Sequence, residues 1–153
     1  MHATFAMNPR SVAIVDAATK DDILEQLSAL FARAYELDSQ QVLEALVERE
    51  SLGSTGFGRG VAIPHARIAR IKRPIAALLR LKRPIDFAAA DGMPVDLVFG
   101  LLSPEGSGAM HLHALAEISR LMRDEEVHDA LSEAPDGEAL YGLLTNASDR
   151  DAA

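Results

Sequence analysis

The sequence predicts a single α/β domain in which a β-sheet is flanked by helices. The chain has 153 residues, and one domain typically holds about 100 to 200 residues. Helical and extended patterns alternate along the chain, without repeats or a linker-like stretch. Residues 95–102 form a nearly continuous apolar run, which is typical of a strand in a sheet that is covered on both faces.

The first half of the chain is predicted to hold one short strand and two amphipathic helices. Residues 12–15 are a short extended run. Residues 19–22 resemble a capping box, and the helix that follows carries apolar side chains at helical spacing as far as Ala34. A second helix is expected to begin at Asp38 or Ser39 and to end near Gly53.

The second half is predicted to form the rest of the sheet and then three helices. The expected strands are residues 60–63, 75–81 and 95–102. The expected helices are residues 109–122, 125–133 and 136–146, and residues 148–153 are expected to be frayed.

Composition and charge exclude several function classes. The formal net charge of -8 argues against general binding to nucleic acid or to anionic membranes. Residues 59–83 nevertheless carry eight of the 15 basic residues and no acidic residue, so this segment either handles an anion locally or forms solvated strand ends. The absence of cysteine excludes disulfides and a thiol nucleophile. Without a signal peptide or an apolar run of about 20 residues, we expect a cytoplasmic protein with no membrane insertion.

A glycine-rich stretch precedes one of the histidines. Four of the ten glycines lie within residues 53–60, which indicates a phosphate cradle or a tight entry into a strand. A P-loop is excluded because Gly58 is followed by Arg59 and Gly60 rather than by Lys and Ser or Thr. No dinucleotide-binding fingerprint occurs either.

His65 is the candidate nucleophile. It follows Pro64 at the exit of a short apolar strand, and the proline fixes its own φ and biases Ile63 towards an extended backbone. The backbone that carries the imidazole is therefore conformationally restricted. His2 and His128, by contrast, are predicted to be ordinary surface residues.

Two further histidines lie near the start of the helix predicted after the sheet. At about 100° per residue, His111 falls on the same side as Ile118 and Met122, whereas His113 falls on the opposite side with Glu117. The two histidines therefore do not converge on one metal. We expect His113 to be a solvated or capping residue and His111 to face the protein from the first turn, where free N–H groups favour an anion.

The segment around His65 resembles a known phosphorylation site. Glu50, followed by the run of residues 57–66, resembles the signature of the fructose/mannitol-type enzyme IIA domains of the bacterial phosphotransferase system. Residues 49–56, 83–87, 91–99 and 111–115 extend this likeness to the stand-alone nitrogen-regulatory IIA branch over roughly residues 7–147 of a single domain spanning residues 1–153.

The resemblance implies a mixed β-sheet flanked by helices. It also implies that a histidine-containing phosphocarrier protein phosphorylates His65, most simply on Nε2, with Arg49 and His111 lining the site. The residue types suit this chemistry, because a neutral imidazole attacks phosphorus and positive or N–H groups surround the transferred oxygens. The expected phosphate-binding groups, besides the Arg49 fork and the His111 donor, are Ser54, Thr55, Gly58 and Gly60. No metal or cofactor is needed.

Three other functions stay open at this point. A sugar-transport IIA would pass its phosphoryl group to the cysteine of a IIB protein, which this chain would have to meet in trans. A metal hydrolase built on histidines is disfavoured by the diverging His111 and His113. A plain interaction module is the third. We expect a regulatory role, in which phosphorylation changes the binding of targets such as a potassium transporter subunit or a sensor kinase, as the resemblance implies.

Overall fold

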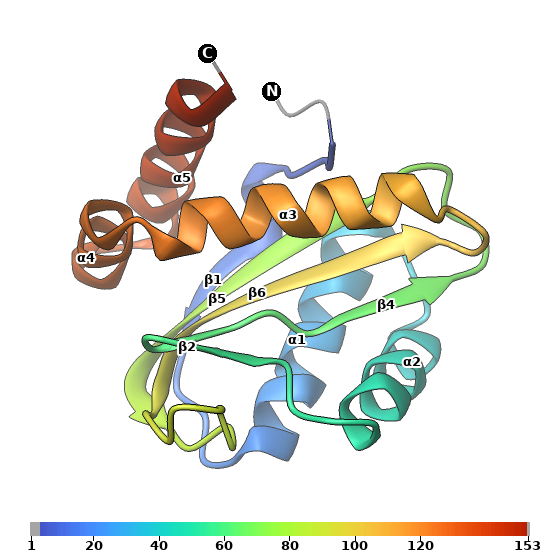
Figure 1. Ribbon diagram of the computed structural model, residues 1–153, viewed down its shortest axis with the longest axis horizontal. Helices are drawn as coiled ribbons and strands as arrows, with labels where there is room; N and C mark the ends of the chain where they lie inside the picture. Colours follow the sequence, from blue (N-terminus) through green and yellow to red (C-terminus); the bar gives the residue numbers. More distant parts are fainter. Residues whose placement is uncertain (1–3, 153) are drawn as a thin grey trace.

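The fold is a mixed β-sheet with helices on both faces (Figure 1). The computed structural model describes residues 4–152, with side chains described as far as residue 149. Within this range the six strands are β1 (Val12–Val15), β2 (Gly56–Gly58), β3 (Val61–Ala62), β4 (His65–Ile68), β5 (Ile75–Ile85) and β6 (Val95–Pro104). The helices are α1 (Lys20–Tyr35), α2 (Ser39–Ser51), α3 (Ala109–Arg123), α4 (Glu125–Glu133) and α5 (Gly137–Ala152), and Pro9–Ser11 forms a 3-10 turn.

The strand order is β1-β5-β6-β3-β2, and β4 pairs with β6 as well. β1 lies parallel to β5, and both β3 and β4 lie parallel to β6. β5 and β6 are antiparallel, as are β2 and β3. The expectation of a mixed sheet flanked by helices is therefore confirmed.

The two faces of the sheet hold two hydrophobic clusters. Alternate side chains of β6 point to opposite faces, as the two-residue period of a strand requires, so Leu97 and Phe99 enter one cluster and Val98 the other. α3, α4 and α5 cover the first face, and α1 and α2 cover the second (Figure 1). This two-sided burial explains the apolar run that the sequence shows at residues 95–102.

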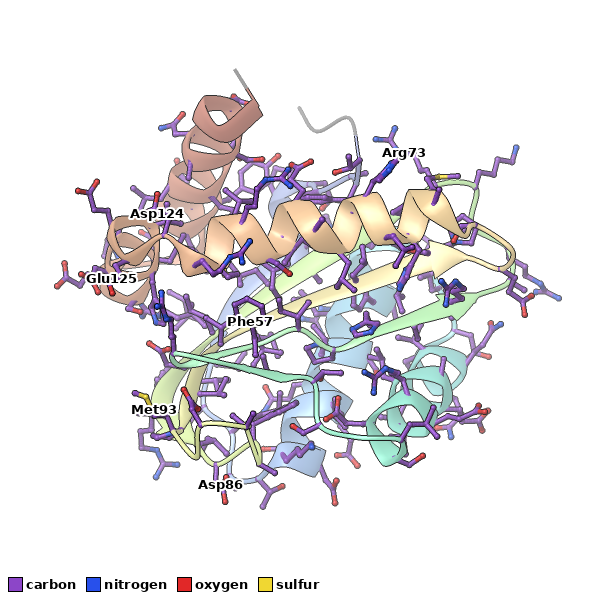
Figure 2. All side chains as sticks on the ribbon, in the orientation of Figure 1. Phe57, Arg73, Asp86, Met93, Asp124 and Glu125 are labelled. Atoms are coloured by element: carbon purple, nitrogen blue, oxygen red, sulfur yellow. The ribbon has the colours of Figure 1, made fainter. Side chains whose placement is uncertain are left out.

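Side chains cap several helix starts, among them those of α1, α2 and α4. The Thr19 side chain accepts from Asp22 N at 3.1 Å, and the Asp38 side chain accepts from Gln40 N at 3.0 Å, so both predicted caps are confirmed. Asp124 caps α4 at the turn where Asp124 and Glu125 join α3 to α4 (Figure 2). None of the helices within residues 4–152 is both long and apolar enough to cross a bilayer.

Several element boundaries differ from the prediction. β2 and β4 were not predicted, and β5 continues to Ile85. The expected fraying after residue 147 is wrong as far as residue 152, because α5 runs to Ala152 and Ser148 is only 1% exposed. The Ser148 hydroxyl lies 3.4 Å from the buried carboxylate of Glu117, so this turn packs against α3. Ala153 lies outside the described residues.

Two polar side chains of α3 and α4, Glu117 and His128, are held by residues that are distant in the sequence. Nε2 of His128 lies 2.9 Å from Asp96 Oδ1, and the Ser132 hydroxyl donates to Asp96 Oδ2 at 2.8 Å. These two contacts connect α4 to β6. Glu117 is buried in contact with Thr4 and Ser148. The prediction that His128 is an ordinary surface residue is wrong, because its partner Asp96 lies 32 residues away in the sequence. His2 lies outside the described residues.

Candidate functional site

The candidate site is a cavity of about 430 Å³ where β4, the last turn of α2 and the first turn of α3 meet. Each of these three elements contributes one residue that was predicted to act in the site, namely Arg49 from α2, His65 from β4 and His111 from α3. The remaining lining residues are Ala45, Glu48, Leu52, Ala66, Arg67, Leu112 and Leu115. The cavity therefore combines basic and imidazole groups with an apolar rim.

His65 is held in a defined tautomer. Its Nδ1 lies 2.8 Å from the carbonyl oxygen of Ile63, and because a carbonyl only accepts, Nδ1 carries the hydrogen. Nε2 of the neutral ring then keeps its lone pair. Burial lowers the pKa of His65 below its ordinary value, and the charge of Arg49 also lowers it, although the bond to Ile63 opposes this shift. The ring is therefore neutral at neutral pH and available as a nucleophile.

His111 faces His65 across the cavity. The two ring centroids are 5.6 Å apart, and His111 is only 3% exposed. Its Nδ1 lies 2.6 Å from the hydroxyl oxygen of Ser103 on β6. Burial, the charge of Arg67 and the neighbouring His65 lower the pKa of His111 to about 4. His113, two residues later, is exposed, so the predicted division between the two histidines is confirmed.

Arg49 and Arg67 bring positive charge to the site. Arg49 lies in the last turn of α2, lines the cavity and donates from Nη1 to the carbonyl oxygen of Gly53 at 2.9 Å. Arg67 was not predicted as a site residue. It follows His65 by two positions on β4, and side chains two apart on a strand share a face, so a prediction of β4 would have found it.

Ser54 and Thr55 lie outside the cavity lining, in contrast to their predicted place. The backbone N–H of Thr55 donates to Glu50 Oε2 at 2.9 Å, and its hydroxyl donates to Glu50 Oε1. The Ser54 hydroxyl donates to the carbonyl oxygen of Phe87 at 2.9 Å and accepts from Gly56 N. Both short side chains are thus occupied in holding the loop between α2 and β2.

Gly58 and Gly60 also lie away from the cavity, at the turn between β2 and β3. Their φ angles of 102° and 84° are in the region that favours glycine. A Cβ on Gly60 would lie 3.0 Å from His128 Cε1 and 3.1 Å from Asp96 Oδ1. These glycines allow the turn and the close approach of α4, and the structure does not place their N–H groups on the lining of the His65 cavity.

The arrangement is suited to nucleophilic transfer of an anionic group. It joins a neutral imidazole in a fixed tautomer, a guanidinium and a second imidazole in one cavity. Over the described part of the chain, no group of three or more His, Cys, Asp or Glu side chains is arranged to hold a metal ion.

Comparisons with known proteins agree with this chemistry. The family model for "Phosphoenolpyruvate-dependent sugar phosphotransferase system, EIIA 2" matches residues 6–147. The chain is 45% identical over 138 residues to the nitrogen regulatory protein of Pseudomonas aeruginosa, covering 90% of each chain. It is 46% identical over 135 residues to the nitrogen regulatory protein of Bradyrhizobium diazoefficiens, covering 86% of this chain and 88% of the relative.

A solved structure shows the same fold. The crystal structure of nitrogen regulatory protein IIA-Ntr from Neisseria meningitidis matches with a TM-score of 0.80 and 34% sequence identity, over 89% of this chain and 93% of that one. Because the family model covers most of the chain and relatives above 30% identity cover it nearly end to end, the chain belongs to the EIIA 2 family of the phosphoenolpyruvate-dependent sugar phosphotransferase system.

Proposed function

We propose that this chain is a regulatory phosphocarrier of the nitrogen-regulatory IIA branch, and that His65 accepts a phosphoryl group from the phosphohistidine of a phosphocarrier protein. The observation that carries the proposal is the bond from His65 Nδ1 to the Ile63 carbonyl, which leaves the Nε2 lone pair as the nucleophile in a cavity shared with Arg49 and His111. The likeness to two nitrogen regulatory proteins supports the regulatory role.

The transfer step exchanges one P–N bond for another. The Nε2 lone pair of His65 attacks phosphorus while the bond from phosphorus to the donor's imidazole nitrogen breaks, and that electron pair returns to the donor ring. The His65 ring becomes positive as it is phosphorylated. Its Nδ1–H stays bonded to the Ile63 carbonyl oxygen, which stabilises that charge. No proton has to leave the site.

The neighbouring groups act on the phosphoryl oxygens. The Arg49 fork supplies a permanent positive charge with paired donors. His111 is neutral at neutral pH, so it donates from Nε2 only in the tautomer in which Nδ1 carries no hydrogen. The Ser103 hydroxyl, 2.6 Å from Nδ1, can donate to Nδ1 in that tautomer and so favour it. Ser103 is thereby a positioning residue for His111.

The rim of the cavity suits a protein partner. Leu52 and Leu112 line the cavity and are 81% and 61% exposed, and Val47 and Met110 add further exposed apolar surface on the same two helices. Exposed apolar groups beside a functional pocket favour protein contact. A phosphoryl group carries roughly -1.5 to -2 charge, so its arrival beside this rim alters which partner surfaces can be buried there.

Affinity capture in three states tests the regulatory role. Wild type, His65→Ala and phosphorylated wild type are immobilised, and bound proteins are identified from a lysate of the source organism and with candidate potassium transporter subunits and sensor kinases. The proposal expects at least one partner in only one phosphorylation state. Equal binding of every partner to all three samples, together with rapid passage of phosphate to the cysteine of a sugar-specific IIB protein, would instead favour a transport role.

A further inference from the structure

A buried carboxylate follows the cavity-lining residue Arg49 in the chain. Glu50 follows Arg49 in the last turn of α2, is 9% exposed and does not line the cavity. Burying an ionised carboxylate is costly unless charged and hydrogen-bonding partners surround it. The groups that bind the Glu50 carboxylate therefore indicate its role in the structure.

Glu50 is held by donors from two other segments. Lys20 Nζ, at the start of α1, lies 2.7 Å from Oε2 and also 4.6 Å from the centre of the Phe87 ring. The backbone N–H of Thr55 donates to Oε2 at 2.9 Å, and the Thr55 hydroxyl donates to Oε1. The carboxylate thus fixes Thr55 through both its backbone and its side chain.

A continuous series of hydrogen bonds leads from this carboxylate to the nucleophile. Thr55 is bound to Glu50, and its carbonyl oxygen accepts from Ile63 N at 3.0 Å. The carbonyl oxygen of Ile63 in turn accepts from His65 Nδ1 at 2.8 Å. Glu50 and Thr55, neither of which lines the cavity, therefore help to fix where the Ile63 carbonyl lies.

We infer that Glu50 is a positioning residue for phosphoryl transfer, because through Thr55 and Ile63 its carboxylate holds the carbonyl that fixes the Nδ1–H tautomer of His65. The inference rests on the proposed function of His65. Correct placement matters because a displacement of about 1 Å in a reacting group costs on the order of 100-fold in rate. Glu50 also acts through space: burial lowers the pKa of His65, and the negative charge of Glu50 is among the influences that oppose this shift.

Glutamine can replace Glu50 in this network only with weaker, uncharged bonds. The carboxylate accepts with both oxygens, from Lys20 and from the two donors of Thr55. A glutamine side chain has one acceptor oxygen, which can accept from Lys20 and Thr55 N, and an NH₂ group, to which the Thr55 hydroxyl can only offer its oxygen as acceptor. These bonds lose the charge of the carboxylate and are weaker for it. Glu50→Gln therefore loosens Thr55 while it keeps the volume of the side chain almost unchanged.

The test compares Glu50→Gln and Thr55→Val with Glu44→Gln. Glu44 is an exposed glutamate on the same helix and lies outside the cavity lining, so its variant controls for the loss of one carboxylate from α2. Two quantities are measured: the limiting rate and half-saturating donor concentration of transfer from a phosphorylated phosphocarrier, and the tautomer and pKa of His65 from imidazole ¹⁵N shifts in the unphosphorylated protein.

The inference predicts a roughly 10- to 100-fold lower limiting rate in Glu50→Gln with an unchanged half-saturating concentration. It predicts a gain of the Nε2–H tautomer and a lower pKa of His65 in the same variant. Thr55→Val, which loses one of the two Thr55 bonds, should show a smaller change in the same direction, and Glu44→Gln should match wild type.

A folded Glu50→Gln with the wild-type rate and tautomer would overturn the inference. If Glu50→Gln does not fold, Thr55→Val decides, and a wild-type tautomer and rate there would overturn it equally. Failure of the wild type to become phosphorylated would count against the proposed function alone, since the tautomer comparison uses the unphosphorylated protein and still decides the role of Glu50.

Discussion

His65 and His111 come from different elements, β4 and α3, yet their rings lie 5.6 Å apart at an angle of 46°. Each ring is held through Nδ1, His65 by a carbonyl oxygen and His111 by a hydroxyl. Both rings are therefore held in fixed orientations, and in the proposed transfer Nε2 of His65 is the nucleophile and Nε2 of His111 the donor. This pairing separates His65 and His111 from the exposed His113.

His111→Ala should slow phosphoryl transfer by a factor of roughly 10 to 1,000, because it removes a donor aimed at the transferred group. His113→Ala should leave the rate close to that of wild type, since His113 is exposed on the other side of α3. A rapid-quench assay of transfer from the phosphorylated donor measures both. The reverse order of effects would show that His111 has no part in the reaction.

Arg49→Lys should fold normally and transfer phosphate at least roughly 10-fold more slowly, because lysine keeps the charge but loses the planar fork. Arg33→Lys, at an exposed position on α1, is the matched control. The rates are compared after circular dichroism confirms equal folding. Unchanged rates in both Arg49→Lys and Arg49→Ala would assign Arg49 to structure alone.

The pKa of His111 makes the stability of the protein depend on pH. Its pKa is lowered from 6.5 to about 4 in the folded chain, so below pH 6.5 the unfolded chain binds a proton that the folded chain excludes. The contribution is fully present above pH 6.5 and is lost as the pH falls towards 4. His128, whose pKa is raised by its bond to Asp96, loses its contribution above pH 6.5 instead.

Denaturant titrations at several pH values between 7.5 and 4.5 measure this effect. The slope of unfolding free energy against pH should decrease in His111→Gln by up to about 1.4 kcal/mol per pH unit, the value for one proton. His113→Gln should keep the wild-type slope. Equal slopes in all three proteins would mean that His111 titrates normally in the folded state.

Local signals were sufficient to predict much of the fold. Thr19 and Asp38 mark helix starts through their own short-range bonds, and the run at residues 95–102 reflects burial on both faces of the sheet. The phase of α3 also placed His111 and His113 correctly. In each case the cause lies within one element, so it is visible in the order of the residues.

The remaining features depend on contacts between distant segments. Glu117 shares the His113 side of α3 by its helical phase, yet Thr4 and Ser148 contact it and it is buried. His128 gives no local sign of its bond to Asp96, which lies 32 residues away. Ser54 and Thr55 have residue types that suit phosphate, yet Phe87 and Glu50 occupy their hydroxyls. Sequence periodicity carries no information on such pairings.

The most direct test of the central claim is to locate the phosphoryl group. The purified chain is incubated with phosphoenolpyruvate, enzyme I and a phosphocarrier protein, and intact mass and peptide mapping are followed in wild type and His65→Ala. The account predicts one acid-labile, base-stable phosphate on His65 of the wild type, formed only when both partner proteins are supplied, and none in the variant. Retention of that phosphate in a folded His65→Ala protein would contradict it.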